Sequence, residues 1–98
     1  MEEGNQSDAL LEEETDEQTE FAPFYHVFLH NDDKNTMFHV VFCLCDVFAF
    51  SDSKAKEIML EAHKSGVALC ITEPFEYAET HCNRMLSYSL VATMEPVE

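Results

Sequence analysis

The chain has 98 residues, of which 46% are hydrophobic, and its 20 acidic and 5 basic side chains give a formal net charge of −15. A chain of this length supports one small domain. Its negative charge repels phosphate backbones and anionic lipids, so the composition argues against binding to nucleic acid or to a membrane surface.

The first 22 residues are acidic and poor in apolar side chains. They hold nine of the 20 acidic residues and no Lys or Arg. Because so few apolar groups cannot offset the ordering entropy of a packed segment, we expect a disordered acidic extension over residues 1–22 and a folded core over residues 23–98. Two roles are open for the extension: a solubilising tail, or a segment that engages a partner once the core has docked.

Signals for membrane insertion and export are not apparent in the sequence. No stretch approaches the roughly 20 apolar residues that span a bilayer, and the acidic N-terminus is unlike a signal or transit peptide. We therefore expect a cytoplasmic protein. The cysteines lack the spacing of a disulfide scaffold or a zinc ribbon, so we expect reduced thiols at Cys43, Cys45, Cys70 and Cys82.

The first half of the core reads as a strand followed by two helices. Residues 24–30 are rich in aromatic and β-branched side chains and are bounded by Pro23 and an Asn-Asp-Asp turn, which predicts a strand. Apolar residues recur at helical spacing after Thr36, a suitable N-cap, and predict the first helix. Ser51 starts a second helix that ends at Gly66.

The second half reads as strand, helix and strand. The apolar run at residues 67–72 predicts a buried strand, and Pro74 suits the first turn of a third helix. Residues 88–93 predict a last strand, followed by a short tail over residues 94–96. The order βααβαβ predicts an α+β fold: a two-layer sandwich with a three-stranded antiparallel sheet and three helices on one face.

Several kinds of chemistry are disfavoured by the motifs. Asn31, Asp33 and Asn35 have the spacing of the first three ligands of an EF-hand, but Thr36 and Phe42 stand where that loop needs a glycine and a bidentate Glu. The histidines and cysteines lack zinc-ligand spacing, and there is no nucleophile elbow or phosphate-binding glycine loop. We expect no metal, no cofactor and no catalytic residue.

The densest polar cluster lies where the first strand meets the first helix. The carboxylates of Asp32 and Asp33, the Asn31 amide and His63 near the end of the second helix can each supply a lone pair to an ammonium group. An apolar pocket adjoins this cluster if four residues of the two helices approach the same spot: Met37, Val40, Met59 and Ala62. The alternative interpretation is that these four residues only pack the helices together.

Four blocks of the sequence resemble the ClpS family of protease adaptors. They are residues 29–33 with 36, 37, 40 and 41, residues 58–66, residues 77–80 and residues 93–95. The match covers about residues 24 to 95. The resemblance implies a fold similar to the C-terminal domain of a ribosomal stalk protein, which agrees with the order of elements read above.

The resemblance also implies a function. ClpS-like adaptors bind proteins whose N-terminal residue is Leu, Phe, Tyr or Trp, known as N-degrons, and deliver them to a Clp-type AAA+ unfoldase for degradation. By the family motif, Asn31, Asp33 and His63 would bind the free α-amino group, with Asp32 shaping the same rim. The side-chain pocket would be lined by Met37, Val40, Met59, Ala62 and Leu90.

The implied partner surface lies elsewhere in the chain. The N-terminal domain of a ClpA- or ClpC-like unfoldase would face Glu76, Glu79 and His81, and the acidic extension would correspond to the family's flexible N-terminal segment. His81 stands where a Lys is common, so this contact is expected to be weaker or pH-sensitive.

The chain departs from the family pattern in four further ways, one of which is Asn35 in place of a usual Thr. Ala62 stands where many members have Val, which widens the pocket or loosens its grip by roughly 1–2 kcal/mol at most. The segment between Thr80 and Thr93 is shorter than usual, which argues against Leu90 as a residue of the pocket. Phe42 and Cys45 lie on a helix flank that is polar in typical members, so this flank is either covered by a tail or forms a second contact site.

Two other functions remain open. A domain that docks on the unfoldase and regulates it without recognising N-termini is suggested by Ala62 and by the shortened segment. The intact set of Asn31, Asp33 and His63 argues against it. A small metal-dependent enzyme would require stoichiometric bound metal.

Overall fold

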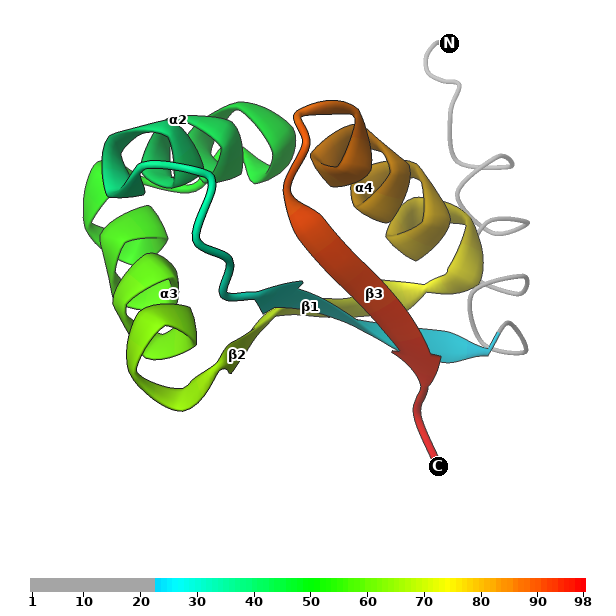
Figure 1. Ribbon diagram of the computed structural model, residues 1–98. Coiled ribbons are helices and arrows are strands. Elements are labelled where there is room, and N and C mark those ends of the chain that lie inside the picture. Colours follow the sequence, from blue (N-terminus) through cyan, green and yellow to red (C-terminus); the bar gives the residue numbers. More distant parts are fainter. Residues whose placement is uncertain (1–22) are drawn as a thin grey trace, which may run out of the picture.

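The computed structural model describes residues 23–98, whose elements follow the order βααβαβ (Figure 1). The expected N-terminal extension, residues 1–22, lies outside the described residues. The elements are β1 (Phe24–His30), α2 (Met37–Phe48), α3 (Asp52–Ser65), β2 (Val67–Pro74), α4 (Phe75–Ser87) and β3 (Val91–Pro96).

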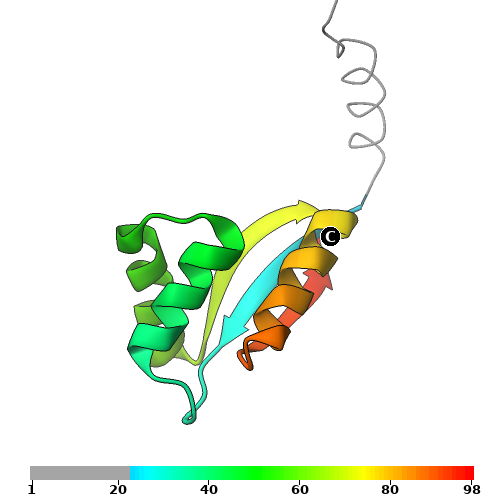
Figure 2. The same ribbon diagram turned by 90° about the horizontal axis from the view of Figure 1, so that it is seen from above.

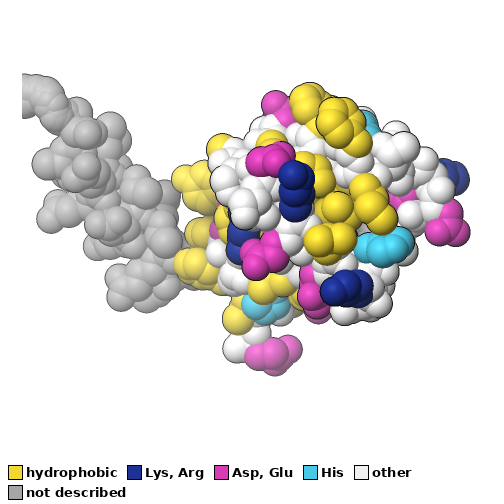
Figure 3. All heavy atoms as spheres, turned by 90° about the vertical axis from the view of Figure 1, so that its left-hand side faces the viewer, with side chains coloured by type: hydrophobic (Ala, Val, Ile, Leu, Met, Phe, Trp, Pro, Cys, Tyr) yellow, Lys and Arg dark blue, Asp and Glu magenta, His cyan; other side chains and the backbone are white. Residues whose placement is uncertain are grey.

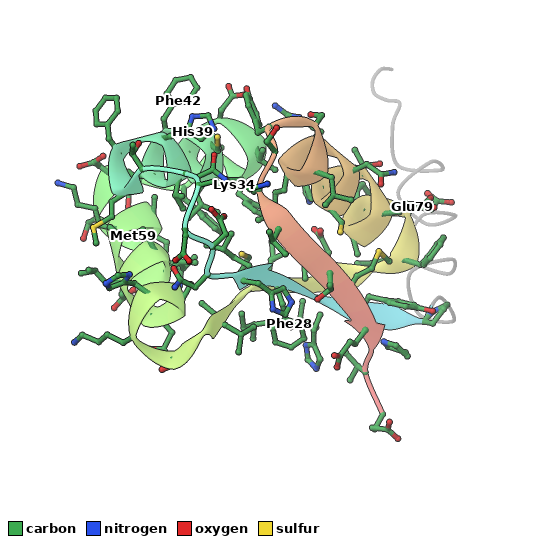
Figure 4. The ribbon with its side chains drawn as sticks, viewed as in Figure 1. Phe28, Lys34, His39, Phe42, Met59 and Glu79 are labelled. Atoms are coloured by element: carbon green, nitrogen blue, oxygen red, sulfur yellow. The ribbon has the colours of Figure 1, made fainter. Side chains whose placement is uncertain are left out.

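The three strands form one antiparallel sheet with β1 in the middle, in the order β2-β1-β3. Successive side chains of β1 point to opposite faces. Val27 and Leu29 are buried beneath the helices, whereas Phe28 points away from them (Figure 4). The pairing of β1 with β2 has an irregularity between Val27 and Phe28.

All three helices lie on the same side of the sheet, as both ribbon views show (Figures 1 and 2). Helix α3 packs on β2, α4 packs on β1 and β3, and α2 packs mainly on α3 and α4. The largest fully buried side chains at the centre are Leu44, Met85, Val27 and Cys43. The predicted fold class is confirmed.

No helix within residues 23–98 is long and apolar enough to cross a membrane.

The predicted helix boundaries at the first two helices are confirmed. The Thr36 side chain accepts a hydrogen bond from the His39 N–H, and the Ser51 side chain accepts one from the Lys54 N–H. Gly66 ends α3 in the left-handed region with φ 90°, where a glycine has no steric penalty.

The predicted boundaries of the last three elements were partly wrong. Strand β2 continues to Pro74, which precedes α4 as its N-cap instead of lying in its first turn. The last strand begins at Val91 and includes the presumed tail, because Met94, Glu95 and Pro96 pair with β1.

Residues 88–90 form the turn after α4 instead of the start of a strand. The N–H groups of Tyr88 and Leu90 donate to carbonyl oxygens of the last helical turn, and Ser89 between them has a left-handed φ of 69°. Their apolar and aromatic composition indicates a strand, but the unpaired carbonyls of a helix end favour this tight turn.

Candidate binding site

A loop of six residues joins β1 to α2 and runs beside the C-terminal end of α3. The Asn31 N–H donates a 3.0 Å hydrogen bond to the Gly66 carbonyl oxygen, which ties the start of the loop to the residue after α3. His63 lies in the last turn of α3. The loop and His63, distant in sequence, therefore meet at one place.

A pocket of about 230 Å³ lies between this loop, α2 and α3. It is smaller than the roughly 300–1,000 Å³ typical of pockets for drug-sized molecules, so its size suits a single side chain. Its lining residues are Leu29, Asn31, Asp32, Asp33, Asn35, Met37, Val40, Met59, Ala62 and His63.

The Asp32 carboxylate organises the loop itself. One of its oxygens accepts hydrogen bonds from the N–H groups of Lys34 (2.7 Å) and Asn35 (2.8 Å), and the other accepts one from the Asn35 side chain (3.1 Å). The backbone hydrogen bond from Asn35 is the main cause that lowers the pKa of Asp32 below its ordinary value of 3.8. Asp32 thus remains charged while both of its oxygens are engaged.

Three polar side chains at the mouth of the pocket are accessible. Asn31, Asp33 and His63 are exposed. None of the ion pairs found between residues 23–98 involves Asp33, so within this part of the chain its carboxylate is available to a ligand. A carboxylate, an amide oxygen and an imidazole nitrogen at one rim can accept the three hydrogens of an ammonium group.

The walls of the pocket are apolar and come from two helices. Met37 and Val40 are three residues apart on α2, and Met59 and Ala62 are three residues apart on α3, so each pair lies on one helical face. Ala62 is buried and adds only a methyl group, whereas Met37 is nearly half exposed. Two flexible methionines allow the pocket to adapt to apolar groups of different shape.

The structure brings together eight of the residues singled out in the sequence: Asn31, Asp32, Asp33, Met37, Val40, Met59, Ala62 and His63. Leu90, the ninth, is a buried core residue and does not line the pocket. Sequence reasoning missed Leu29 and Asn35. Leu29 is the last inward-facing residue of β1, and Asn35 belongs to the polar cluster, so both signals were present.

Asn35 has a structural task besides lining the pocket. Its side-chain amide donates to Asp32 and, at 2.8 Å, to the carbonyl oxygen of Ser89 in the turn after α4. The loop that carries the pocket rim is therefore hydrogen-bonded both to Gly66, which follows α3, and to Ser89, which follows α4. No signal in the sequence pairs Asn35 with Ser89.

The residues expected to face a partner lie on α4. Glu76 and Glu79 are exposed, and Glu79 projects on the opposite side of the molecule from Met59 (Figure 4). The His81 ring is half-buried, and its Nδ1 lies 2.6 Å from the Glu73 carboxylate. This α4 surface is separate from the pocket.

Within residues 23–98, no group of three or more His, Cys, Asp or Glu side chains is placed to hold a metal ion. Cys43 is buried and Cys45 half-buried on α2. Burial raises the pKa of the Cys70 thiol to about 12, so this thiol stays protonated.

Comparison with known proteins gives one consistent family. The family model for the ATP-dependent Clp protease adaptor protein ClpS matches residues 20–94. A ClpS adapter from Synechococcus elongatus is 39% identical over 90 residues, covering 91% of this chain and 95% of the relative. One from Gloeobacter violaceus is 41% identical over 75 residues, covering 76% and 81%.

A solved structure agrees with the sequence relatives. Agrobacterium tumefaciens ClpS2 bound to L-phenylalaninamide superposes with a TM-score of 0.71 at 28% identity, covering 78% of this chain and 99% of that one. The resemblance noted from the sequence is confirmed. The chain belongs to the ClpS family, whose members are adaptors of the ATP-dependent Clp protease and not enzymes.

Proposed function

We propose that this adaptor binds proteins whose N-terminal residue is Leu, Phe, Tyr or Trp and delivers them to a Clp-type AAA+ unfoldase. The observation that carries the proposal is the pocket, in which an acidic and amide rim adjoins apolar walls within one side-chain-sized hollow. A residue with both a free α-amino group and a large apolar side chain satisfies both parts at once.

The rim accounts for selection of a free N-terminus. An α-ammonium group loses water when it docks, so it needs hydrogen-bond acceptors and a negative charge beside it. Asn31, Asp33 and His63 offer these at the mouth of the pocket. L-phenylalaninamide, the ligand of the Agrobacterium ClpS2 structure, carries the same two groups, a free amine and a benzyl side chain.

Delivery requires a second surface that stays free while the pocket is occupied. Glu76, Glu79 and His81 on α4 form our proposed contact with the N-terminal domain of a ClpA- or ClpC-like unfoldase. Because Glu79 and the pocket residue Met59 project on opposite sides, substrate and unfoldase can bind together (Figure 4).

The test is fluorescence anisotropy with peptides that differ only in the first residue, which is Leu, Phe, Trp, Tyr, Val or Met. Leu and the aromatic residues are expected to bind, and N-acetylation of the Phe peptide is expected to abolish binding by removing the charge and a donor. Asp33→Asn should weaken binding about tenfold, since it removes a charge-assisted hydrogen bond.

The matched control is Glu57→Gln, which neutralises an exposed carboxylate of α3 outside the pocket lining. It should leave the affinity unchanged. Absence of binding to every peptide would reject N-terminal recognition. If the protein then still bound a Clp ATPase, its role would be regulation of the unfoldase by docking alone.

A further inference from the structure

A second hollow lies beside the pocket, between α2 and α3. It has a volume of about 530 Å³, and we call it the α2–α3 groove. Its apolar lining includes Phe38, Phe42, Cys45 and Leu60, together with Met37 and Met59. Figure 3, which views the side of the molecule where α2 and α3 lie, shows hydrophobic side chains gathered there with charged side chains around them.

The groove is strongly exposed for an apolar surface. The exposed fractions are 83% for Phe38, 54% for Phe42 and 44% for Leu60. In Figure 4 Phe42 points away from the sheet, where no described element covers it. A contiguous exposed apolar surface with polar residues around it is typical of a ligand-binding groove or a protein interaction site.

The groove and the pocket are continuous. Met37 and Met59 line both hollows, one from each helix. A ligand whose first side chain sits in the pocket therefore has the groove next to it, across these two methionines. Along α2 the groove extends from Met37 to Cys45, about 12 Å, which corresponds to about three residues of extended peptide.

The charges of the groove favour an uncharged occupant. Its two charged lining residues, Asp52 and Lys56, pair with each other at 3.0 Å. No unpaired positive charge remains in the lining to attract an acidic segment. The chain's own first 22 residues, with nine acidic side chains and no basic one, are therefore poorly matched to it.

We propose that the α2–α3 groove binds the second to fourth residues of the substrate and selects apolar side chains among them. This inference rests on the proposed function, because it extends the same site along the bound chain. Its substrates are proteins that begin with a large hydrophobic residue and continue with at least one more apolar residue nearby. Phe38 and Leu60 are the specificity-determining residues.

The experiment compares four labelled peptides that begin with Leu. One continues with Ser at positions two to four, and each of the others carries a second Leu at one of these positions. We expect at least one of the three to bind about tenfold more tightly than the Ser peptide, as partial burial of one apolar side chain provides.

Variants locate the gain. The ratio of interest is the affinity for the tightest peptide with a second Leu divided by the affinity for the Ser peptide. Phe38→Gln and Leu60→Gln should each reduce this ratio to about one. Leu86→Gln is the matched control, because Leu86 is also on a helix surface, is 48% exposed and lies on α4 outside the groove. This control should keep the full ratio, and thermal unfolding checks that all three variants fold.

The outcomes separate this inference from the proposed function. Equal binding of all four peptides would overturn the groove proposal and leave N-terminal recognition intact. Binding of none would overturn both. If the four bind equally and the protein also forms dimers that Phe38→Gln dissolves, as sedimentation would show, the groove belongs to a second copy of the chain and not to the substrate.

Discussion

Asn31 and Gly66 are joined by one backbone hydrogen bond of 3.0 Å, although 35 positions separate them in the chain. Asn31 leaves the middle strand of the sheet, and Gly66 follows the helix that carries Met59, Ala62 and His63. The bond fixes the acidic loop against the end of that helix. The pocket forms where the loop after β1 lies against the C-terminal end of α3.

The geometry at Gly66 predicts a loss of stability on substitution. A Cβ added there would meet no atom within 4 Å, but φ is +90°, so Gly66→Ala is strained by its backbone alone. We expect a loss of about 1 kcal/mol in urea unfolding. Ala49→Gly is the opposite case, since Ala49 has a φ of 60°, and it should not destabilise the protein. Equal stability of wild type and Gly66→Ala would contradict this account.

The Asp32 hydrogen bonds predict a pH dependence of stability. The pKa of Asp32 is lowered in the folded protein, so its contribution is present above the ordinary value of 3.8 and is lost as pH falls below it. Asp32→Asn should therefore flatten the curve of unfolding free energy against pH between about 5 and 2. Asp33→Asn, without such bonds, provides the comparison. Parallel curves for wild type and Asp32→Asn would show that these hydrogen bonds do not perturb the titration.

The small side chain at position 62 predicts a change in first-residue preference. Ala62→Val adds two carbon atoms to a pocket of about 230 Å³ and should lower the affinity for a Trp peptide more than for a Leu peptide. Anisotropy titrations give the ratio, and thermal unfolding shows whether the buried site tolerates the larger residue. An unchanged ratio in a folded variant would place Ala62 outside the ligand's reach.

The separation of the two proposed surfaces predicts independent losses of function. Glu79→Lys reverses an exposed charge on α4 and should weaken binding to the Clp ATPase of the same organism without changing peptide affinity. Surface plasmon resonance with the immobilised N-terminal domain of the ATPase measures ATPase binding, and fluorescence anisotropy measures peptide affinity. The control is Glu57→Lys on α3. Identical ATPase binding by both variants would move the docking surface away from α4.

The sequence carries local signals for the pocket, and the resemblance to the ClpS family implied that these residues line one site. The helical spacing of Met37 with Val40 and of Met59 with Ala62 places each pair on one face, and caps at Thr36 and Ser51 set where the helices begin. What sequence reasoning could not reach depends on contacts between distant segments. Nothing in the sequence links the Asn35 side chain to the Ser89 carbonyl or places Leu90 in the core.

The last strand shows the same limit. Residues 88–90 have the composition of a strand, yet they form the turn after α4. The charged Glu95 lies in the last strand and pairs with His26. Strand register depends on which partner is available, and composition alone does not encode that partner.

Helix α2 rests mainly on α3 and α4, whereas α3 rests on β2. The two walls of the pocket are therefore positioned by different contacts. Packing on the sheet positions the wall with Met59, and packing against α3 and α4 positions the wall with Met37. Contacts between α2 and α4, such as the 3.1 Å ion pair of Asp46 with Arg84, thus help to fix the width of a pocket that neither residue lines. Under the proposed function, substitutions at such contacts would change the range of accepted first residues without changing any residue that lines the pocket.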